Sequence, residues 1–378
     1  LITSAKKMGF HVVTAGSQAF GFARNLADKH FQIDYSSKDE ILQLAKYLKI
    51  DAICSCANDF GILTAAYVGE ALNLSGHDSF KTPEQLHHKN SFKKLVRELN
   101  INSPTELSEE EINLASTNGA RDLFPLMVKP IDLTGGKGIT IVKHSSELPA
   151  AIAKARQISR RRQIVVEKFI EGDLFSFSSL IRNQRVICYF NDHEMSHANP
   201  FLVTTSGGPP DNTNIVAEQL IPQIERISQH LNLCDGIFHI QYIFAQRKAF
   251  ILEVTRRCSG DLYPIPVSYA LSIDWGALII KSESGEPTGI EQNINQQGFY
   301  GRHCIMGDKD GTVTKVEFSD ELKACICEEY VWWKPGYRIS NYLTDKLGVI
   351  ILKFPSRTRM LTLLKEINSH IRITYNEI

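Results

Sequence analysis

The chain has 378 residues, of which 43% are hydrophobic and 22% charged, and its formal net charge is zero. That length allows two or three packed units with a cleft between them, and the balanced charge argues against nucleic acid as a partner. The sequence has no apolar run near the roughly 20 residues that cross a bilayer and no leader-type start, so we expect a soluble, cytoplasmic protein.

The first 86 residues alternate helical and strand-like patterns. Residues 1–8 and 38–48 have helical patterns, whereas residues 11–15 and 51–55 are strand-like. Such alternation is typical of βαβ units around a parallel sheet. We therefore predict a Rossmann-like domain over residues 1–86, and we expect its first strand to be missing because the pattern opens within a helix.

A second unit begins near Lys89, where a helix leads to Pro104. From Phe124 the pattern changes to strands, which we place at residues 125–129, 138–143, 163–169, 175–181, 185–190, 237–244 and 249–254. A helix is expected at residues 215–231. Mixed strands with few helices indicate an α+β unit, which we place at residues 87–278 with a lid subdomain at about 120–172.

The last hundred residues carry several glycine-containing turns and a helical pattern near residues 356–371. We expect a small C-terminal domain over residues 279–378. The fold class predicted for the whole chain is thus α/β and α+β.

The strongest local pattern is a strand that carries Lys129 near its end and leads into a glycine-rich loop. The loop residues are Thr134, Gly135, Gly136, Lys137 and Gly138. A lysine fixed on a strand is a cation, and glycines let backbone N–H groups approach phosphate oxygens closely. We predict a triphosphate-binding lid. The alternative is a surface lysine before a glycine-rich hairpin.

A second strand runs from Val165 into a turn at Gly172. Backbone groups that leave a strand end can pair with the edge of a base, and apolar neighbours can cover it. The candidate adenine hinge consists of Glu167, Lys168, Phe169 and Ile170. A plain strand with charged flanks is the alternative.

Two later strands carry four polar residues, His239, Gln241, Glu253 and Thr255. We place the hairpin loop between them at residues 246–248, and counting outward sets Gln241 opposite Glu253. His239 then faces Thr255, so all four side chains share one face. An oxygen-rich face with one carboxylate suits Mg²⁺ that carries nucleotide phosphates, and a half-exposed polar sheet face is the alternative.

Four further residues are candidate substrate contacts. Asn58 and Asp59 follow a predicted strand, at the end of a sheet where ligands of α/β domains gather, although capping of the next helix is the alternative. Asp261 is placed either to orient an amine or to shape a turn. Arg302 lies near the start of the C-terminal domain.

Taken in order, these segments resemble the ATP-grasp superfamily, which includes biotin carboxylase, carbamoyl phosphate synthetase and many carboxylate–amine ligases. The resemblance covers nearly the whole chain and implies an ATP-grasp fold with a pre-domain, a two-part grasp region and a small C-terminal domain. Lys89 and Lys129 match its two phosphate-binding lysines. Residues 134–138 match its flexible loop over the triphosphate, and residues 167–170 match its adenine hinge.

The resemblance also implies that Glu253 and Gln241 hold Mg²⁺. It further implies that Arg257 and Lys129 are catalytic residues. Two departures concern this site. Gln241 stands where the family usually has an acid, and Thr255 stands where asparagine is usual. A third departure is Leu174 at the position of the ribose-binding acid, where Asp173 is the neighbouring substitute.

The activity that the resemblance implies is an ATP- and Mg²⁺-dependent ligase. It would activate a small-molecule carboxylate as an acyl phosphate for attack by an amine, releasing ADP and phosphate. The alternatives are a bicarbonate-activating carboxylase or carbamoyl-phosphate-type enzyme, and a degenerate nucleotide-binding protein without catalysis. We expect small-molecule carboxylate and amine partners, neither nucleic acid nor a membrane, and we leave a homodimer open.

Overall fold

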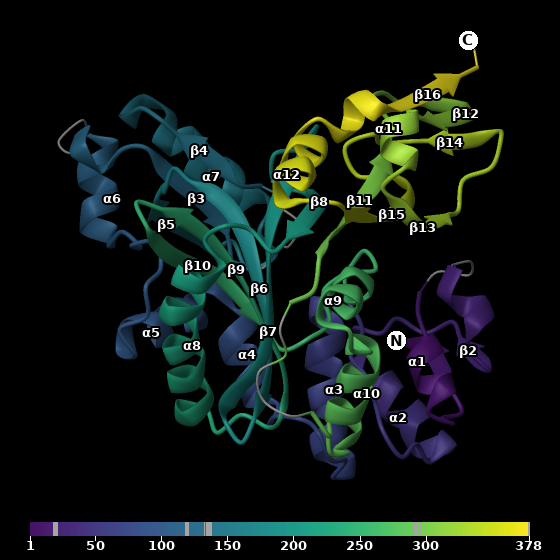
Figure 1. Ribbon diagram of the computed structural model, residues 1–378. Helices are drawn as coiled ribbons and strands as arrows, with labels where there is room; N and C mark the ends of the chain where they lie inside the picture. The colour runs from purple at the N-terminus through teal and green to yellow at the C-terminus, as the bar shows by residue number, and fades with distance from the viewer. Residues whose placement is uncertain are drawn as a thin grey trace.

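The computed structural model describes residues 1–17, 22–117, 121–131, 133, 138–290, 294 and 296–376. Within these residues an eight-stranded sheet forms the centre, and three smaller sheets lie around it (Figure 1). The chain contains helices, and its strands pair in both parallel and antiparallel fashion. The α/β and α+β class predicted from the sequence is confirmed.

The central sheet joins strands from two distant parts of the chain. In spatial order they are β10 (Lys248–Thr255), β9 (Gly236–Ala245), β6 (Asp173–Arg182), β7 (Arg185–Ser196), β8 (Val203–Gly208), β11 (Phe299–Met306), β15 (Lys346–Phe354) and β13 (Ile326–Val331). All neighbours are antiparallel. The sequence patterns did not identify β8, which pairs with β11 and so connects the two sets of strands.

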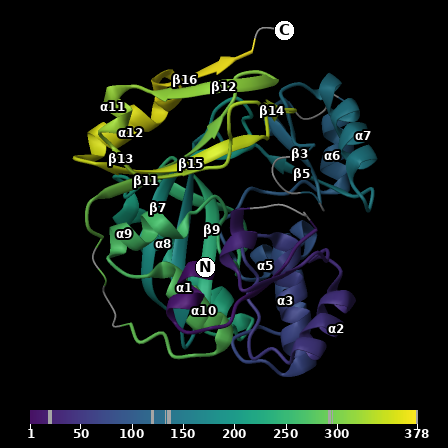
Figure 2. The ribbon, with the colours of Figure 1, turned by 90° about the vertical axis from the view of Figure 1, so that its right-hand side faces the viewer.

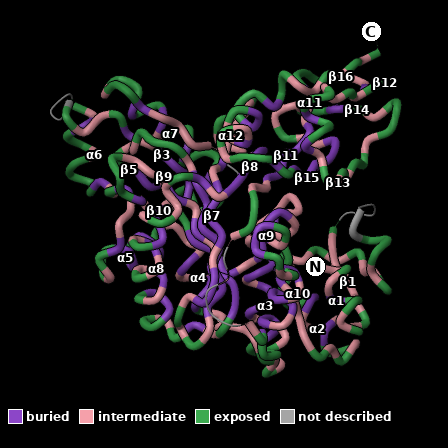
Figure 3. Tube along the Cα trace, in the orientation of Figure 1, coloured by how far each residue is buried: buried purple, intermediate pink, exposed green. Residues whose placement is uncertain are grey.

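Helices cover both faces of one end of this sheet. On one face, α8 (Thr213–His230) and α5 (Lys89–Glu98) pack on apolar side chains of β6, β9 and β10. On the other, α9 (Pro264–Leu271) and α10 (Trp275–Ser284) pack on β6, β7 and β9. Figure 1 shows α8 on the opposite side of the sheet from α9 and α10. Buried residues concentrate in these central strands (Figure 3).

The predicted lid forms a three-stranded sheet of its own, in the order β4 (Thr140–Val142), β3 (Leu126–Pro130) and β5 (Ile164–Lys168). Its apolar face packs on α6 (Glu109–Ser116) and α7 (Leu148–Ile158). The short helices η2 (Arg121–Leu123) and η3 (Ser145–Glu147) precede β3 and α7. A capping box of Ser108 and Glu111 begins α6, because each side chain bonds to the other residue's backbone N–H.

The C-terminal part adds a second three-stranded sheet above β11, β13 and β15 (Figure 2). Its strands are β14 (Tyr337–Ile339), β12 (Gly311–Phe318) and β16 (Ile371–Tyr375), with α11 (Asp320–Lys323), α12 (Arg357–Lys365) and η4 (Ile367–His370) packed on them. The single helix predicted at residues 356–371 is therefore wrong beyond Lys365. Ile371 and Ile373 are two residues apart and pair with β12, which favours a strand there.

The N-terminal part is built mainly of helices. They are α1 (Ile2–Lys7), η1 (Phe22–Leu26), α2 (Lys38–Leu48), α3 (Asp59–Leu72) and α4 (Lys81–His87), beside the parallel pair β1 (Val13–Ala15) and β2 (Lys29–Phe31). The helix predicted at residues 38–48 is confirmed. Residues 51–55, predicted as a strand, form none. β1 pairs with β2 in a two-stranded sheet, and residues 53–55 and β1 both border a cavity of about 680 Å³.

No helix in the described part of the chain has both the length and the apolar character that a membrane crossing requires.

Candidate functional site

The first part of the candidate site is a cluster of Glu167 with two lysines. Lys129 Nζ, from β3, donates to Glu167 Oε2 at 2.7 Å, and Lys93 Nζ, from α5, lies 2.7 Å from Glu167 Oε1. Glu167 is 3% exposed, and its burial raises the pKa of the carboxyl, but the two ammonium groups outweigh burial and hold that pKa below its ordinary value. Two cations on one carboxylate leave a net positive charge.

Lys89 connects this cluster to the rest of the site. It begins α5, and its Nζ donates to the carbonyl oxygen of Leu133 at 2.9 Å. Burial lowers the pKa of Lys89, and the charges of Glu253 and Lys129 also act on it. The structure therefore brings the two predicted phosphate lysines together. It adds Lys93, which the sequence analysis missed although it lies one turn after Lys89 on the same face of a helix.

Gly138 is the residue of the predicted glycine-rich loop that the structure describes. Thr134, Gly135, Gly136 and Lys137 lie outside the described residues. Gly138 has a φ of +75°, and a Cβ atom there would lie 1.9 Å from Cδ1 of Ile158. Only glycine fits this turn into β4.

The predicted hinge, residues 167–170, is anchored to the lid by its backbone. The N–H groups of Lys168 and Phe169 donate to the carbonyl oxygens of Thr105 and Pro125 at 2.9 and 3.0 Å. Asp173 is exposed at the start of β6, opposite Phe244. The hinge and Asp173 thus lie where the lid joins the central sheet.

The predicted pairing of Gln241 with Glu253 is confirmed, but the chain achieves it differently. The hairpin loop has two residues, Gln246 and Arg247, both with positive φ, so Lys248 pairs with Ala245 and the predicted loop at residues 246–248 is wrong. A bulge between Ile251 and Glu253 then shifts the register by one residue. The two differences cancel.

Behind this pair lies a carboxylate from a third strand. Gln241 Nε2 donates to Glu194 Oε2 on β7 at 2.6 Å. Burial raises the pKa of Glu194 to about 7. On the same strand Asp192 accepts hydrogen bonds from Ser176 and, at 2.9 Å, from Tyr263. The polar face is therefore more acidic than the sequence analysis expected.

Gln241 and Glu253 are the oxygen-bearing side chains that this face offers to Mg²⁺. Among the described residues no group of three His, Cys, Asp or Glu side chains could hold a metal. Glu253, which is exposed, and Gln241 opposite it offer one carboxylate and one amide. Mg²⁺ commonly binds through one or two carboxylates plus substrate phosphates and keeps several waters, so the two residues fit a nucleotide-borne Mg²⁺.

Arg257 is held by the N-terminal part of the chain. Its Nε donates to Asp59 Oδ1 at 2.6 Å, and His87 Nδ1 lies 3.7 Å from the same oxygen. Burial lowers the pKa of His87 to about 4, so this histidine is neutral at pH 7. Asn58 caps α3, because its Oδ1 accepts from the N–H of Phe60 at 2.9 Å. Asp59 thus orients Arg257, and Asn58 has a structural role.

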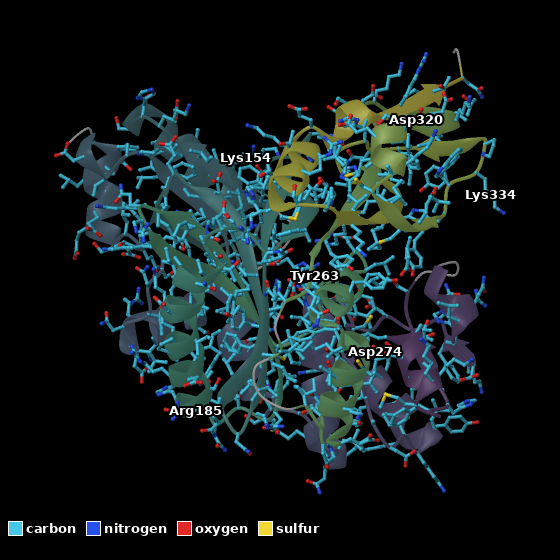
Figure 4. The ribbon with its side chains drawn as sticks, in the orientation of Figure 1. Lys154, Arg185, Tyr263, Asp274, Asp320 and Lys334 are labelled. Atoms are coloured by element: carbon cyan, nitrogen blue, oxygen red, sulfur yellow. The ribbon has the colours of Figure 1, made fainter. Side chains whose placement is uncertain are left out.

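The remaining two candidates, Asp261 and Arg302, form a second ion-pair cluster. Lys346 Nζ lies 2.5 Å from Asp261 Oδ1, and Arg302 Nη1 lies 3.5 Å from Asp261 Oδ2. Burial raises the pKa of Asp261, but the charges of Arg302 and Lys346 hold it below the usual value. Arg302 also lies over the ring of Tyr263, near the middle of the molecule in Figure 4. This cluster therefore adjoins the acidic face.

A comparison with protein families matches residues 123–264 to a family model described as an ATP-grasp domain. Among curated proteins, the large chain of carbamoyl phosphate synthase from Thermoanaerobacter pseudethanolicus is 25% identical over 202 residues, which are 52% of this chain and 18% of that protein. The chain thus spans about a fifth of the length of the curated relatives that it matches.

Solved structures resemble the whole chain. An L-amino acid ligase from Bacillus licheniformis has a TM-score of 0.79 at 20% identity and covers 100% of this chain and 95% of its own. The biotin carboxylase domain of the Hydrogenobacter thermophilus 2-oxoglutarate carboxylase, solved with MgADP, ADP and bicarbonate, has a TM-score of 0.79 at 16% identity, covering 99% and 87%. The predicted ATP-grasp fold is confirmed.

Proposed function

We propose that this chain, which carries an ATP-grasp domain at residues 123–264, is an ATP- and Mg²⁺-dependent carboxylate–amine ligase. It activates a small-molecule carboxylate as an acyl phosphate, which an amine then attacks, and it releases ADP and phosphate. One observation carries the proposal. Lys129 and Lys93 share the single buried carboxylate of Glu167, which leaves an excess positive charge, and the charges of both Lys129 and Glu253 act on Lys89. This arrangement suits a polyphosphate with its metal ion.

The lysines bind the phosphates and neutralise them. A phosphoryl group in transfer carries negative charge on its outer oxygens, and fixed cations aimed at it lower the barrier. When the nucleotide binds, the Lys129 ammonium must donate to a phosphate oxygen as well as to Glu167, so its contact with Glu167 weakens. Because Lys93 also contacts Glu167, that carboxylate keeps a counter-charge during the exchange. A buried carboxylate left without one would cost several kcal/mol.

Arg257 holds the transferred phosphoryl group or the oxyanion formed during attack. Its Nε is bound by Asp59, and its Nη1 donates to the carbonyl oxygen of Cys258 at 3.0 Å. Two fixed contacts set the plane of the guanidinium before the substrate arrives. Pre-orientation of this kind favours the transition state over the ground state.

Glu253 and Gln241 are the residues that would hold Mg²⁺, which when bound offsets charge on the phosphates and so assists the transfer. Asp261, Lys346 and Arg302 are the proposed contacts of the amine or the carboxylate, because they form a partly buried charged cluster beside the same face.

The test follows one oxygen atom. Mg·ATP is incubated with pools of amino acids and other small carboxylates, and with bicarbonate alone, and ADP release identifies the acid. That acid, labelled with ¹⁸O in its carboxylate, should transfer one heavy oxygen to the released phosphate. Arg257→Ala should raise the barrier to this transfer by about 2.7–4 kcal/mol, which lowers its rate on the order of 100- to 1,000-fold, while ATP affinity is retained.

Three results would contradict the proposal. Unlabelled phosphate in a coupled reaction excludes an acyl phosphate. ADP release with bicarbonate alone indicates the carboxylase alternative. ATP binding without ADP release from any pool indicates a nucleotide-binding protein without catalysis.

A further inference from the structure

The acidic face contains a carboxylate, Glu194, to which the sequence patterns assign no role. We propose that Glu194 supplies the negative charge that the metal-holding face lacks at Gln241, and that it turns the amide of Gln241 so that its oxygen serves the metal. Glu194, Gln241 and Glu253 then act as one unit. This inference rests on the proposed function, since the metal is the one that accompanies the nucleotide.

The sheet geometry makes the contact available. Gln241 is on β9 and Glu194 is on β7, with β6 between them. The β6 residue directly between Gln241 and Asp192 is Ser176, which pairs with both. Ser176 donates to Asp192, and Gln241 Nε2 reaches Glu194 Oε2, two residues further along β7, at 2.6 Å.

The hydrogen bond fixes which amide atom remains for a metal. An amide nitrogen has no lone pair to offer a cation, whereas the amide oxygen has two. Because Nε2 is bound to Glu194, Oε1 is the free end of the amide of Gln241. Partners behind metal ligands commonly orient them and raise their basicity in this way.

The surroundings of Glu194 agree with this role. Its exposed fraction is 6%, and among the described residues no cation lies within ion-pair distance of it. The charge of Asp192 acts with burial to raise the pKa of Glu194, and Arg302 and Glu253 act on it more weakly. A metal ion beside Gln241 would supply the nearby cation that Glu194 lacks, and the contact with Gln241, rather than burial alone, points to this role.

The test measures metal binding without turnover. The probe is Mn²⁺ with a non-hydrolysable ATP analogue, and free Mn²⁺ is followed by electron paramagnetic resonance. Glu194→Gln keeps an oxygen that accepts from Gln241 but removes the charge, and it should weaken Mn²⁺ binding by about 10- to 100-fold. The control is Glu283→Gln, which changes a carboxylate of similar burial on α10 and should leave Mn²⁺ affinity unchanged.

An exchange variant sharpens the result. Gln241→Glu combined with Glu194→Gln restores one charge and one amide to the same pair, and its Mn²⁺ affinity should return toward that of the unchanged protein. If Glu194→Gln does not fold, this variant alone decides. If the double variant still binds Mn²⁺ about tenfold or more weakly than the unchanged protein, the inference is overturned.

Binding of the analogue in EDTA separates the two proposals. If the unchanged protein binds the analogue and Glu194→Gln binds Mn²⁺ normally, this inference is wrong and the proposed function stands. If the unchanged protein binds no analogue with or without metal, both are wrong.

Discussion

Two buried glutamates in this molecule are stabilised in opposite ways. Glu167, between α5 and the lid, contacts two lysines, and its pKa is held below the ordinary value. Glu283, on α10, has no lysine within ion-pair distance in the described part of the chain. It accepts from the backbone N–H of Ser55 at 2.7 Å and from the Ser55 hydroxyl at 3.2 Å, and burial raises its pKa to about 7.

The comparison shows that burial of a carboxylate does not by itself identify a site. At Glu283 neutral donors satisfy the group, and the protein can keep it protonated. At Glu167 the cations exceed what one carboxylate needs. The excess positive charge is what indicates an anionic ligand, and each prediction below tests that difference.

The largest effect is expected for Glu167→Gln. The variant leaves Lys93 and Lys129 buried without their counter-charge, which should lower the free energy of unfolding by about 3–5 kcal/mol at pH 7. Urea denaturation measures it. Glu283→Gln at pH 5 is the comparison and should change stability little, because a protonated carboxyl and an amide are alike. If both variants lose the same free energy of unfolding, the two glutamates are not stabilised differently.

The pH dependence of Glu283 should be nearly as large. A folded-state pKa of about 7 against an unfolded value of 4.5 means that the folded state holds the proton more tightly. Stability of the unchanged protein relative to Glu283→Gln should therefore fall as pH rises from 4.5 to 7, by roughly 3 kcal/mol, and stay level above pH 7. Urea denaturation of both proteins across this range checks it, and parallel curves would contradict it.

A smaller effect is expected for Lys129→Ala on nucleotide binding. Loss of one charge-assisted contact should weaken ATP binding by about 2 kcal/mol, or roughly 30-fold, measured by calorimetry. Lys93 keeps Glu167 paired, so the variant should fold. Lys154→Ala, an exposed lysine on α7 of the same lid (Figure 4), is the matched control. If Lys129→Ala binds ATP as tightly as the unchanged protein, the excess positive charge does not bind the phosphates of ATP.

Local patterns predicted the elements of the site better than its contacts. Lys129 was identified because a strand and a glycine-rich loop are adjacent in the chain, and β3 is present there. The opposition of Gln241 and Glu253 was also predicted, but only because a shorter loop and a bulge offset each other. Register can be counted from a loop only when the strands are regular.

Contacts between distant segments could not be predicted in the same way. Glu194 reaches Gln241 across β6, and Asp59 reaches Arg257 from the N-terminal part. Neither pairing leaves a periodic trace in the sequence. Residues 51–55 show the reverse failure, since a strand-like pattern forms no ladder without a neighbouring strand.

The pairing of β8 with β11 has a consequence for synthesis of the chain. Tyr300 pairs with Gly208, and strands β6 to β10 are complete at Thr255, before β11 begins at Phe299. Until then the edge of β8 presents unpaired backbone groups, and an exposed strand edge invites aggregation. The central sheet can be completed only once residues 299–306 have been made, so a nascent chain stalled before residue 299 should aggregate more readily than the full chain.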